Sequence, residues 1–330
     1  KVVHYHHHGA PLCAHGAKLG VHHLAVFCIQ VSGGLVQQRN GRGLRQQKRK
    51  KGKLALAARK AAHAALRHAL QPGAPQGKAH LFALALRQAA AVMNGMICCR
   101  PLDRGKKKAI AITCFGVTTP CVDRCAGLLQ EEGYEVLIFH ARGSSGGKIM
   151  EKMIAEGHFC AVLDVTTTEL ADEVAGGIYS VGPRRLREAP AHGIPYIVVP
   201  GALEMINLGS EDTLQPAQKA RTLYYHSPSS VKMRANGAEM KELGEIFIQR
   251  LQHSRPGMTK VIIPARGFSS VDMPGKVFSD PDANQIFINE VKYKMPSNVP
   301  VMIQDSHVND RAFADVLVRE LLRMMPKTQY

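Results

Sequence analysis

The chain has 330 residues, of which 45% are hydrophobic and 21% are charged, with 43 Lys and Arg against 26 Asp and Glu. This composition excludes a short peptide, a collagen-like chain and a chain that is disordered throughout, and the length predicts one or two domains. Gly, Pro, His or a charged residue interrupts every apolar stretch before it reaches the roughly 18 to 20 residues of a membrane-spanning helix. We therefore expect a soluble protein with no membrane partner.

The positive charge is concentrated in the first third of the chain. The formal net charge is +17, and residues 1–108 hold 20 basic residues but only one acidic residue, Asp103. The remaining residues are almost neutral, with a net charge of −2. Strong basicity favours nucleic acid or an acidic surface as a partner, so this argument applies to the N-terminal segment alone.

The cysteines indicate the cell compartment. All eight lack paired CxxC spacing, and the His-rich N-terminus does not fit a signal peptide. Reduced thiols are the default in the cytoplasm, so we expect a cytoplasmic protein. Cys121 and Cys125 lie one helical turn apart, but no second pair is near, and we expect packing residues rather than zinc ligands. We identify no protein metal site.

Residues 1–84 are predicted to be a basic extension, poorly ordered or artefactual, rather than a packed domain. Residues 1–80 hold ten of the sixteen histidines, and the run KRKKGK stands at 48–53. Three interpretations remain: a nucleic-acid-binding or nuclear-localisation arm, a transit peptide, or an extension never selected to fold, such as a gene-model or frame artefact. Aromatic residues for base stacking are nearly absent, and Ser is too scarce for a transit peptide. We therefore do not expect nucleic acid as the main partner.

From Lys108 onward, apolar runs of five to seven residues alternate with amphipathic stretches. Continuous apolar strands indicate burial on both faces of a sheet. The sequence therefore predicts an α/β fold over residues 85–330, an open and mostly parallel Rossmann-like sheet with helices on both faces. A (β/α)₈ barrel would need two more units, unless the N-terminal segment supplied them. The strand-like runs are residues 109–119, 135–141, 160–168, 195–203, 260–270 and 299–310.

Amphipathic stretches between these runs predict the helices. They cover residues 122–134, with Gly133 as the C-terminal stop, and residues 148–157, 169–177 and 311–325. Right-handed crossovers place the loop after each parallel strand at the carboxyl edge of the sheet. Loops that are far apart in sequence should therefore share one crevice.

A glycine-rich loop, HARGSSGGK at residues 140–148, stands between a predicted strand and a predicted helix. Glycines let backbone N–H groups point at an anion, and the helix N-terminus adds positive partial charge. The loop is not a Walker A motif, because Arg142 and Ile149 stand where that motif has Gly and Ser or Thr. It predicts either a phosphate site or a tight structural turn. The candidate ligands are His140, Gly143, Ser144, Ser145, Gly146 and Gly147.

Two other predicted loops are rich in small and hydroxyl residues, and a third contains Gly201, which allows close approach of a ligand. The threonines at 166–168 have a second interpretation, since Thr167 or Thr168 suits the N-cap of the helix that follows. Together with the glycine-rich loop, they predict a nucleotide site. The further candidates are Gly116, Val117, Thr118, Thr119, Thr166, Thr167, Thr168, Pro200, Gly201 and Ala202.

Two arginines are candidates for phosphate oxygens, because a guanidinium binds them with a bidentate geometry that Lys lacks. They are Arg234, in HSPSSVKMR, and Arg266, in PARGFSS. Exposure to solvent at the surface is the alternative for both.

Three residues are candidates for acid–base catalysis, which would make the protein a small-molecule hydrolase or lyase. His140 and Glu204 follow predicted strands, and His307 belongs to DSHVND at the end of the last strand. In the same motif, Asp310 also suits the N-cap of the closing helix. The sequence does not settle whether the protein is an enzyme.

Six motifs in sequence order carry a family resemblance: ITCFGVTTPCV, EVLIFHARGSSGGKIMEKMI, VLDVTTTELADEVAGG, VPGALEMINLG, HSPSSVKMR and DSHVNDRAFA. They resemble the ATP-binding domain family of the tomato mosaic virus resistance protein and its uncharacterised bacterial and fungal homologues. The match covers about residues 85–330. The resemblance implies two Rossmann-like subdomains, of which only the second is recognisable here, because residues 1–80 do not resemble the first.

The resemblance also implies a ligand and partners. It implies ATP, for which Mg²⁺ is expected as a companion, held by the loop residues named above. It implies no virus-inhibiting role, which depends on a surface that the motifs do not define. Bacterial members often accompany a barrel domain related to phosphoenolpyruvate-using enzymes, so a barrel-domain protein and a second copy of the chain are partners to consider.

Overall fold

The computed structural model describes residues 84, 87–92, 95, 108–143 and 146–325. The chain divides into two units, residues 1–103 and residues 104–330, whereas the sequence placed the boundary at residue 85. In the first unit the described residues are helical. The rest of the predicted basic extension lies outside the described residues, and the fold below is that of the second unit.

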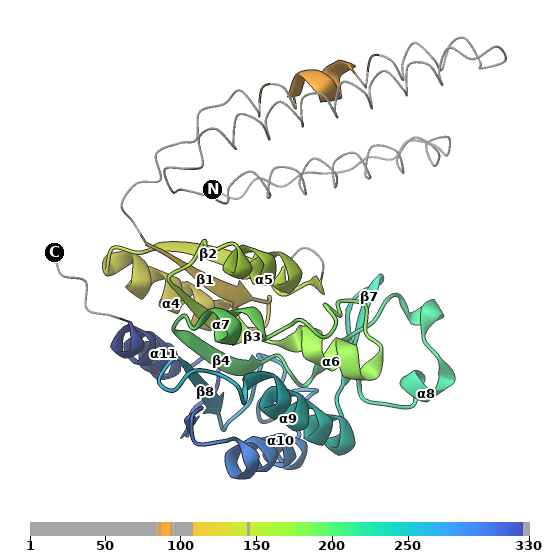
Figure 1. Cartoon of the computed structure of the whole chain (residues 1–330). Coiled ribbons are helices and arrows are strands. Elements are labelled where there is room, and N and C mark those ends of the chain that lie inside the picture. The colour runs from red at the N-terminus through yellow and green to blue at the C-terminus, as the bar shows by residue number, and fades with distance from the viewer. Residues whose placement is uncertain (1–83, 85–86, 93–94, 96–107, 144–145, 326–330) are drawn as a thin grey trace, which may run out of the picture. The chain divides into compact units, whose positions relative to one another are not determined.

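The second unit contains the predicted open α/β sheet (Figure 1). Its strand order is β2-β1-β3-β4-β8-β9, and every neighbouring pair is parallel. All six predicted strands are confirmed. They are β1 (Ala109–Cys114), β2 (Glu135–His140), β3 (Ala161–Thr166), β4 (Tyr196–Gly201), β8 (Thr259–Pro264) and β9 (Val301–Gln304).

The position of each strand in the sheet follows from its composition. The central strands β3 and β4 are buried at every residue, as their largely apolar sequences predict. The edge strand β2 alternates between exposed and half-buried residues. The strand order reverses beside β1, because β2 lies on one side of β1 and the next strand in sequence, β3, lies on the other side. This reversal is the point at which open α/β sheets bind ligands, just outside the carboxyl ends of the strands.

Helices cover both faces of the sheet, as predicted (Figure 1). One face packs against α4 (Thr119–Glu131) and α11 (Arg311–Met324), with Cys121 and Cys125 fully buried in that core. The described cysteines are free, and these two serve as packing residues. The other face packs against α5 (Gly147–Ala155), α6 (Thr168–Ala175), α7 (Glu188–His192), α9 (Gly237–Leu251) and α10 (Pro281–Lys294).

A second, antiparallel sheet was not predicted. It has the order β5-β7-β6 and is made of β5 (Met205–Asn207), β6 (Leu223–Ser227) and β7 (Ser230–Arg234), with the short helices η2 (Glu211–Thr213) and α8 (Pro216–Lys219) between β5 and β6. These strands have three to five residues each. Runs this short, with mixed polarity, show no clear periodicity. The insertion follows β4 directly, so it lies at the carboxyl end of the main sheet.

Two predicted helix boundaries are confirmed. Gly133 adopts a left-handed φ of 84° just after α4, which a residue with a side chain rarely adopts. Asp310 is the N-cap residue of α11, although its carboxylate accepts from the His307 N–H at 2.8 Å and makes no hydrogen bond to the helix.

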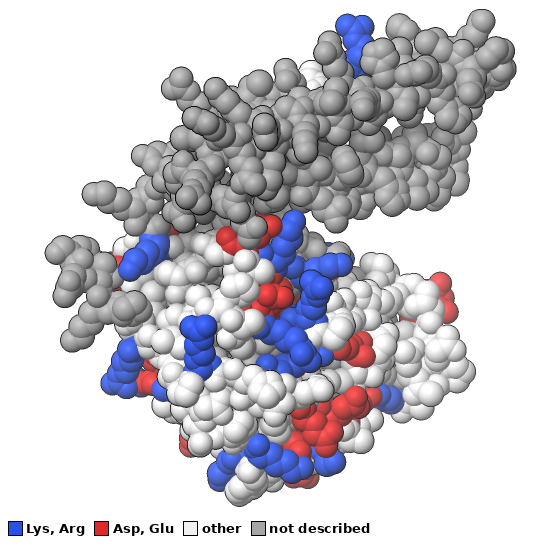
Figure 2. Space-filling view, viewed as in Figure 1, with Lys and Arg blue, Asp and Glu red and all other residues white. Residues whose placement is uncertain are grey.

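The surface of the second unit carries both signs of charge. Figure 2 shows Lys and Arg mixed with Asp and Glu over the face in view, consistent with the near neutrality of the chain after residue 108. Within the described ranges, no helix combines the length and the apolar character needed to cross a membrane.

We predict that Gly201→Ala destabilises the fold. A Cβ at this buried position would lie 2.1 Å from the carbonyl oxygen of Val165, and backbone cannot yield as a flexible side chain can. Overpacking of this kind costs about 1–3 kcal/mol in the free energy of unfolding, which urea denaturation would measure.

Gly116→Ala is the matched control at the same edge of the sheet, because a Cβ on Gly116 would meet nothing within 4 Å. Its effect should stay within about 0.5 kcal/mol. Equal stability of the two variants would contradict the packing described between β3 and β4.

Candidate functional site at the carboxyl edge of the sheet

The loops after the six parallel strands meet at one edge, as the sequence predicted. The Val117 carbonyl, after β1, accepts from Ser270 N at 3.0 Å and from Asn309 Nδ2 at 2.9 Å, which belong to the loops after β8 and β9. The Thr118 and Thr166 hydroxyls are 2.8 Å apart and join the ends of β1 and β3. Three further hydrogen bonds complete the connections: Ala141 N to Cys114 O, Thr167 N to Gly201 O, and Ala202 N to Phe268 O.

Bulky side chains fill part of this edge. Phe115, Met205 and Phe278 form a small buried apolar cluster, against which Tyr179 and Tyr224 pack. The cluster joins the loop after β1 to the antiparallel sheet. Gly116 and the end of β2 stay exposed beside it, so a ligand has access to the part of the edge near β1 and β2.

The glycine-rich loop is folded onto a carboxylate of the protein itself. The Glu169 Oε1 atom, in the first turn of α6, accepts from the N–H groups of Gly143 and Gly147 at 3.0 Å each. A Cβ on Gly147 would lie 2.2 Å from Glu169 Oε2, so this carboxylate explains the glycine. The two amides that we assigned to a phosphate are occupied by Glu169. Ser144 and Ser145 lie outside the described residues.

A buried arginine holds Glu169 in place. Arg185 is fully buried and binds Asp164 on β3 with both terminal nitrogens, while its Nε donates to Glu169 at 2.6 Å. Asp164 also accepts from the Tyr196 hydroxyl and the Thr113 hydroxyl, both at 2.7 Å. The network joins β1, β3, β4, α6 and the glycine-rich loop.

A third carboxyl group, that of Glu151 on α5, completes this network. It accepts from Arg185 at 3.4 Å and from the backbone N–H groups of Leu186 at 2.6 Å and Glu188 at 3.0 Å. Burial raises the pKa of Glu151 to about 7, against the opposing effect of Arg185. The Arg185 guanidinium thus donates to three carboxyl groups, of which that of Glu151 is partly protonated at neutral pH.

Of the predicted threonines, Thr118 and those at 166–168 are buried and Thr119 is half-buried, and their hydroxyls are bound within the protein. Thr166 N donates to the Thr113 hydroxyl at 2.9 Å, and the Thr168 hydroxyl donates to Met205 O at 2.8 Å. Thr167 is the N-cap of α6, but its hydroxyl donates to Val199 O at 3.2 Å and not to the helix. Pro200, Gly201 and Ala202 are likewise buried. These residues shape the edge rather than line its exposed part.

Neither predicted arginine points at the exposed part of the edge. Arg234 is buried, and its guanidinium donates to the carbonyls of Phe278, Ala235 and Asp280 and to the Asn284 side chain. Arg266 is exposed and forms a two-point ion pair with Asp305 at 2.7 Å. Arg234 thus anchors the antiparallel sheet, and Arg266 joins the loops after β8 and β9.

Two of the three acid–base candidates lie on either side of Ser269. The Ser269 hydroxyl donates to Glu204 Oε1, and the Ser269 carbonyl accepts from His307 Nε2 at 2.9 Å. His307 Nδ1 accepts from Asn309 N at 3.1 Å, so both ring nitrogens are engaged. Among the described residues, no hydrogen bond joins His140 to this group, so the structure does not assemble the three predicted residues into one catalytic set.

Glu204 is the most perturbed acid in the interior of this edge. It is fully buried, and its Oε2 atom has no hydrogen-bond partner in the described part of the chain. Burial, with the nearby Asp272 carboxylate, raises the pKa of Glu204 to about 8. Glu204 is therefore largely protonated at pH 7.

Beside the exposed part of the edge lies a cluster, which we call the cation–aromatic cluster, of which the sequence predicted His140 but neither Arg142 nor Lys232. Three basic residues surround two rings. Lys232 Nζ lies 5.2 Å from the centroid of Phe115 and 5.5 Å from that of Tyr179. The Arg142 guanidinium lies 5.1 Å from the Tyr179 centroid, and the His140 ring stacks on Phe115 at 5.1 Å.

The basic residues of this cluster repel one another. Burial lowers the pKa of Lys232 to about 8. The charge of Asp172 opposes this effect, and that of Arg142 adds to it. Burial likewise lowers the pKa of His140, and the charges of Arg142 and Lys232 add to that effect. Within the described ranges, Lys232 and His140 have no carboxylate within 4.0 Å. An anion placed among them would relieve the repulsion.

Asp172 and Asn207 hold Lys232 in this position. The register of the antiparallel sheet pairs Asn207 with Lys232, and Lys232 Nζ donates to Asn207 Oδ1 at 2.6 Å. The Asp172 carboxylate accepts from Asn207 N at 2.6 Å and from Tyr179 N at 2.9 Å. Burial raises the pKa of Asp172 to about 7. One carboxyl group on α6 thus positions both the partner of the lysine and the ring beside it.

A weak sequence signal for Lys232 exists. Lys232 and Arg234 are two residues apart in HSPSSVKMR, so both point to one face of a strand. We selected Arg234, because a guanidinium suits phosphate best. Both side chains are buried, but Arg234 binds backbone carbonyls, whereas Lys232 lies against Phe115 and Tyr179 beside the exposed edge.

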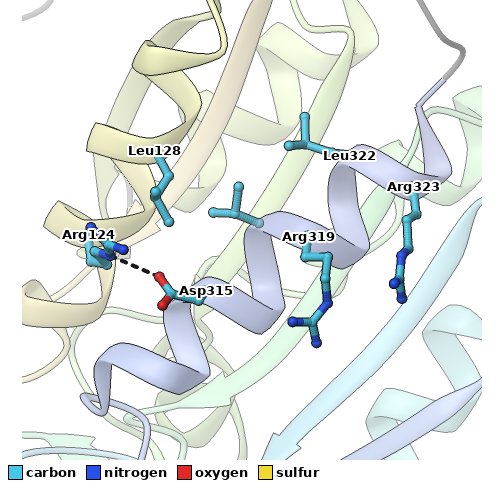
Figure 3. A pocket seen from close by; sticks show the side chains of 7 residues that line it. Arg124, Leu128, Asp315, Arg319, Leu322 and Arg323 are labelled. Carbon is cyan, nitrogen blue, oxygen red and sulfur yellow. Dashed lines mark hydrogen bonds and ion pairs between the residues drawn. The ribbon is translucent and has the colours of Figure 1, made fainter.

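A shallow groove lies elsewhere, between α4 and α11 (Figure 3). The Arg124–Asp315 ion pair, at 2.9 Å, spans it, and Leu128 and Leu322 contribute apolar surface. The groove contains none of the predicted ligand residues. No group of three or more His, Cys, Asp or Glu in the described segments is arranged to hold a metal ion.

The fold and the site define the class of this protein: an open parallel α/β domain whose strand ends converge at a switch point. The sequence pattern of the uncharacterised protein family UPF0261, C-terminal domain, matches residues 107–325, and the chain belongs to this family. The predicted resemblance is confirmed, with a start about 20 residues later than expected.

Relatives of this chain occur in bacteria and in a plant. A UPF0261 protein of Clostridium tetani is 38% identical over 244 residues, which are 73% of this chain and 60% of that protein. The ToMV resistance protein Tm-1(GCR237) of Solanum lycopersicum is 35% identical over 254 residues, 74% of this chain and 33% of that protein. A Mesorhizobium japonicum UPF0261 protein is 33% identical over 240 residues, 72% of this chain and 60% of that protein. The chain thus spans a third to three fifths of these proteins.

We predict that Arg185→Met destabilises the fold by about 3–5 kcal/mol, because it leaves the carboxylates of Asp164 and Glu169 buried without their cation. The free energy of unfolding in urea measures this loss. Arg124→Met is the control, since the Arg124–Asp315 pair is roughly 40% exposed and should contribute at most about 1 kcal/mol. Similar losses in the two variants would contradict the role given to Arg185.

We predict that stability falls as the pH rises toward 8, and that Glu204→Gln reduces this fall. The native state keeps a proton on Glu204 up to a pKa of about 8, whereas an unfolded glutamic acid loses it near pH 4.3. The contribution of Glu204 to the free energy of unfolding is therefore complete below about pH 4. It is lost progressively as the pH rises from about 4 to 8, with a slope of up to about 1.4 kcal/mol per pH unit.

Urea denaturation of both proteins between pH 5.5 and 8.5 measures this slope. Part of the slope should remain in the variant, because Glu151 and Asp172 also have raised pKa values, of about 7. Identical slopes in the two proteins would show that Glu204 is ionised in the native state.

Proposed function

We propose that this domain binds a phosphorylated nucleotide, ATP in the first instance, at the carboxyl edge of its sheet between β1 and β2. The observation that carries the proposal is the cation–aromatic cluster, in which Lys232, Arg142 and His140 lie around two rings at the carboxyl edge of the sheet. The family resemblance to ATP-binding domains supports the choice of nucleotide.

The electrostatics of the edge support a phosphate in particular. A guanidinium and an ammonium in a site partly shielded from water attract multiply charged anions more strongly than the same groups at an open surface. The N-terminus of α4 adds to this field, because the helix has no acidic residue in its first turn and Thr118 makes no capping hydrogen bond. Gly116, which is exposed just before this helix, leaves room for the ligand.

This proposal assigns the phosphates to different residues from those that the motifs suggest. Gly116, Val117, Thr119 and His140 stay as neighbours of the ligand. Arg142 and Lys232 replace Arg234 and Arg266 as the cations. The buried threonines and residues 200–202 act indirectly, by fixing the loops that carry the exposed groups.

A magnesium ion that enters with ATP would be bound mainly by the phosphate oxygens of the nucleotide. Mg²⁺ keeps several waters and uses only one or two carboxylates at such sites. Within the described segments, the exposed part of the edge offers no group of three or more acidic or other metal-binding side chains. We therefore assign no Mg²⁺ ligand to this chain.

Calorimetric titration of the full chain with MgATP tests the proposal. We expect binding at pH 7 that weakens by about 10-fold or more in Arg142→Gln, since hydrogen bonds to charged groups contribute about 1.5–3 kcal/mol. Affinity should also fall as the pH rises through about 8, because Lys232 loses its positive charge there. Adenosine and tripolyphosphate, titrated separately, divide the affinity between base and phosphates.

Arg266→Gln is the matched control, an exposed arginine at the same edge that pairs with Asp305 and lies outside the cation–aromatic cluster. It should bind MgATP as the unchanged protein does. Absence of both binding heat and a thermal shift with MgATP would overturn the proposal, and equal losses in the two variants would remove Arg142 from the site.

A further inference from the structure

Lys232 has surroundings that differ from those of a surface lysine. Its residue is 4% exposed, its Nζ atom donates to Asn207 Oδ1, and two aromatic rings lie within 5.5 Å of it. Lys241, on α9, shows the ordinary situation, since its exposed ammonium pairs with Glu245 at 3.0 Å. Lys232 has no such carboxylate within 4.0 Å among the described residues.

Burial and the neighbouring Arg142 favour the neutral, nucleophilic amine of Lys232, against the two rings and Asp172, which favour its ammonium form. An amine in an apolar pocket beside another cation loses its proton near neutral pH and then attacks carbonyl carbons. With a pKa of about 8, roughly a tenth of the Lys232 amines are neutral at pH 7, against about 0.04% for a lysine with the usual pKa near 10.4. Asn207 accepts one hydrogen bond and leaves the nitrogen lone pair available once the proton is lost.

The neighbours of Lys232 indicate which carbonyl compound would bind. Arg142 and Lys232 face the same Tyr179 ring, so a ligand anion on the guanidinium lies near the amine. The Arg142 side chain is exposed, which suits a ligand that enters from solvent. A small compound with a carbonyl carbon and a charged group a few bonds away would engage both residues.

We infer that Lys232 forms a Schiff base with a small carbonyl compound that bears a carboxylate or a phosphate, with Arg142 holding the anionic group. This inference rests on the proposed anion site and adds a covalent step to it. The neutral amine attacks the carbonyl carbon, and the C–N bond forms as the C=O π electrons move to oxygen. Transfer of a proton from nitrogen to oxygen gives a carbinolamine, which loses water.

The step is balanced without a further reactant. A lysine ammonium and a carbonyl compound give a protonated imine and one water molecule, so the positive charge is conserved. The imine makes the adjacent carbon easier to deprotonate or to cleave, which is the chemistry of a lyase.

Reductive trapping in the full chain tests the inference. The protein is treated with cyanoborohydride and one of three aldehydes: glyoxylate, which carries a carboxylate, glycolaldehyde phosphate, or uncharged glycolaldehyde. Peptide mass spectrometry then measures the rate of modification at Lys232, with Lys241 in the same molecule as the reference. The probe with the larger ratio identifies carboxylate or phosphate as the preferred group.

We expect both anionic aldehydes to modify Lys232 at least about 10-fold faster than Lys241 at pH 7.5. The rate at Lys232 should rise with a midpoint near pH 8, a profile that a purely structural lysine would not show. Arg142→Gln should reduce the rate with the anionic aldehydes more than that with glycolaldehyde, which falls only because the pKa of Lys232 rises when the neighbouring cation is removed. Modification of Lys232 no faster than that of Lys241 would overturn the inference.

The two proposals fail in different ways. Nucleotide binding declines as the pH rises through 8, whereas trapping increases, because the first needs the ammonium and the second needs the amine. Binding of MgATP without trapping would remove the Schiff base and keep the anion site. A third outcome is a chain that binds no nucleotide and is trapped at the same rate by charged and uncharged aldehydes, with or without Arg142. This outcome would remove the anion site and with it the proposed substrate class.

Discussion

The Arg185 network is the interaction on which the geometry of the carboxyl edge depends. A single buried guanidinium joins Asp164 on a central strand to Glu169 at the start of α6. Glu169 in turn holds the amides of the glycine-rich loop. Desolvating an arginine costs free energy that only well-placed carboxylates and hydrogen bonds offset. The ends of β1, β3 and β4 and the loop after β2 must therefore keep one arrangement, and the cation–aromatic cluster is built on that arrangement.

The network also explains why a phosphate-like motif can be structural. Glycines before a helix orient N–H groups toward negative charge whether that charge belongs to a ligand or to the protein. Here the carboxylate of Glu169 takes that place. The charge that a ligand would neutralise lies a short distance away, on side chains that come from β2, from the loop after it and from the antiparallel sheet.

The sequence predicts the main sheet because its signal is local. Each of the six strands contains a run of apolar residues, which Asp164 interrupts in β3, and Gly133 marks a helix end by its own conformation. The parallel order then brings the six loops to one edge by topology alone. The small antiparallel sheet has no comparable signal, because its three-residue strand β5 is stabilised by tertiary pairing.

The contacts of the candidate site were harder to predict than the convergence of the loops. The sequence predicted that the loops meet at one edge, but the contact of Glu169 with Gly143 and that of Asp172 with Asn207 span 26 and 35 residues. No spacing rule reveals such pairs. Arg234 and Lys232 look equally suitable in the sequence, and only the contacts of β7 show that Arg234 binds backbone carbonyls whereas Lys232 lies against Phe115 and Tyr179.

The source of Lys232 has a consequence for how this family can diversify. The lysine belongs to the segment between β4 and α9, which forms its own small sheet and contributes no strand to the parallel one. Residues Ile206, Val231 and Met233 of this segment pack into the main core, so only substitutions that keep this packing would change the chemistry offered to a ligand and leave the fold intact. A change of selectivity on this framework would therefore be confined to the side chains of the segment that lie beside the exposed edge.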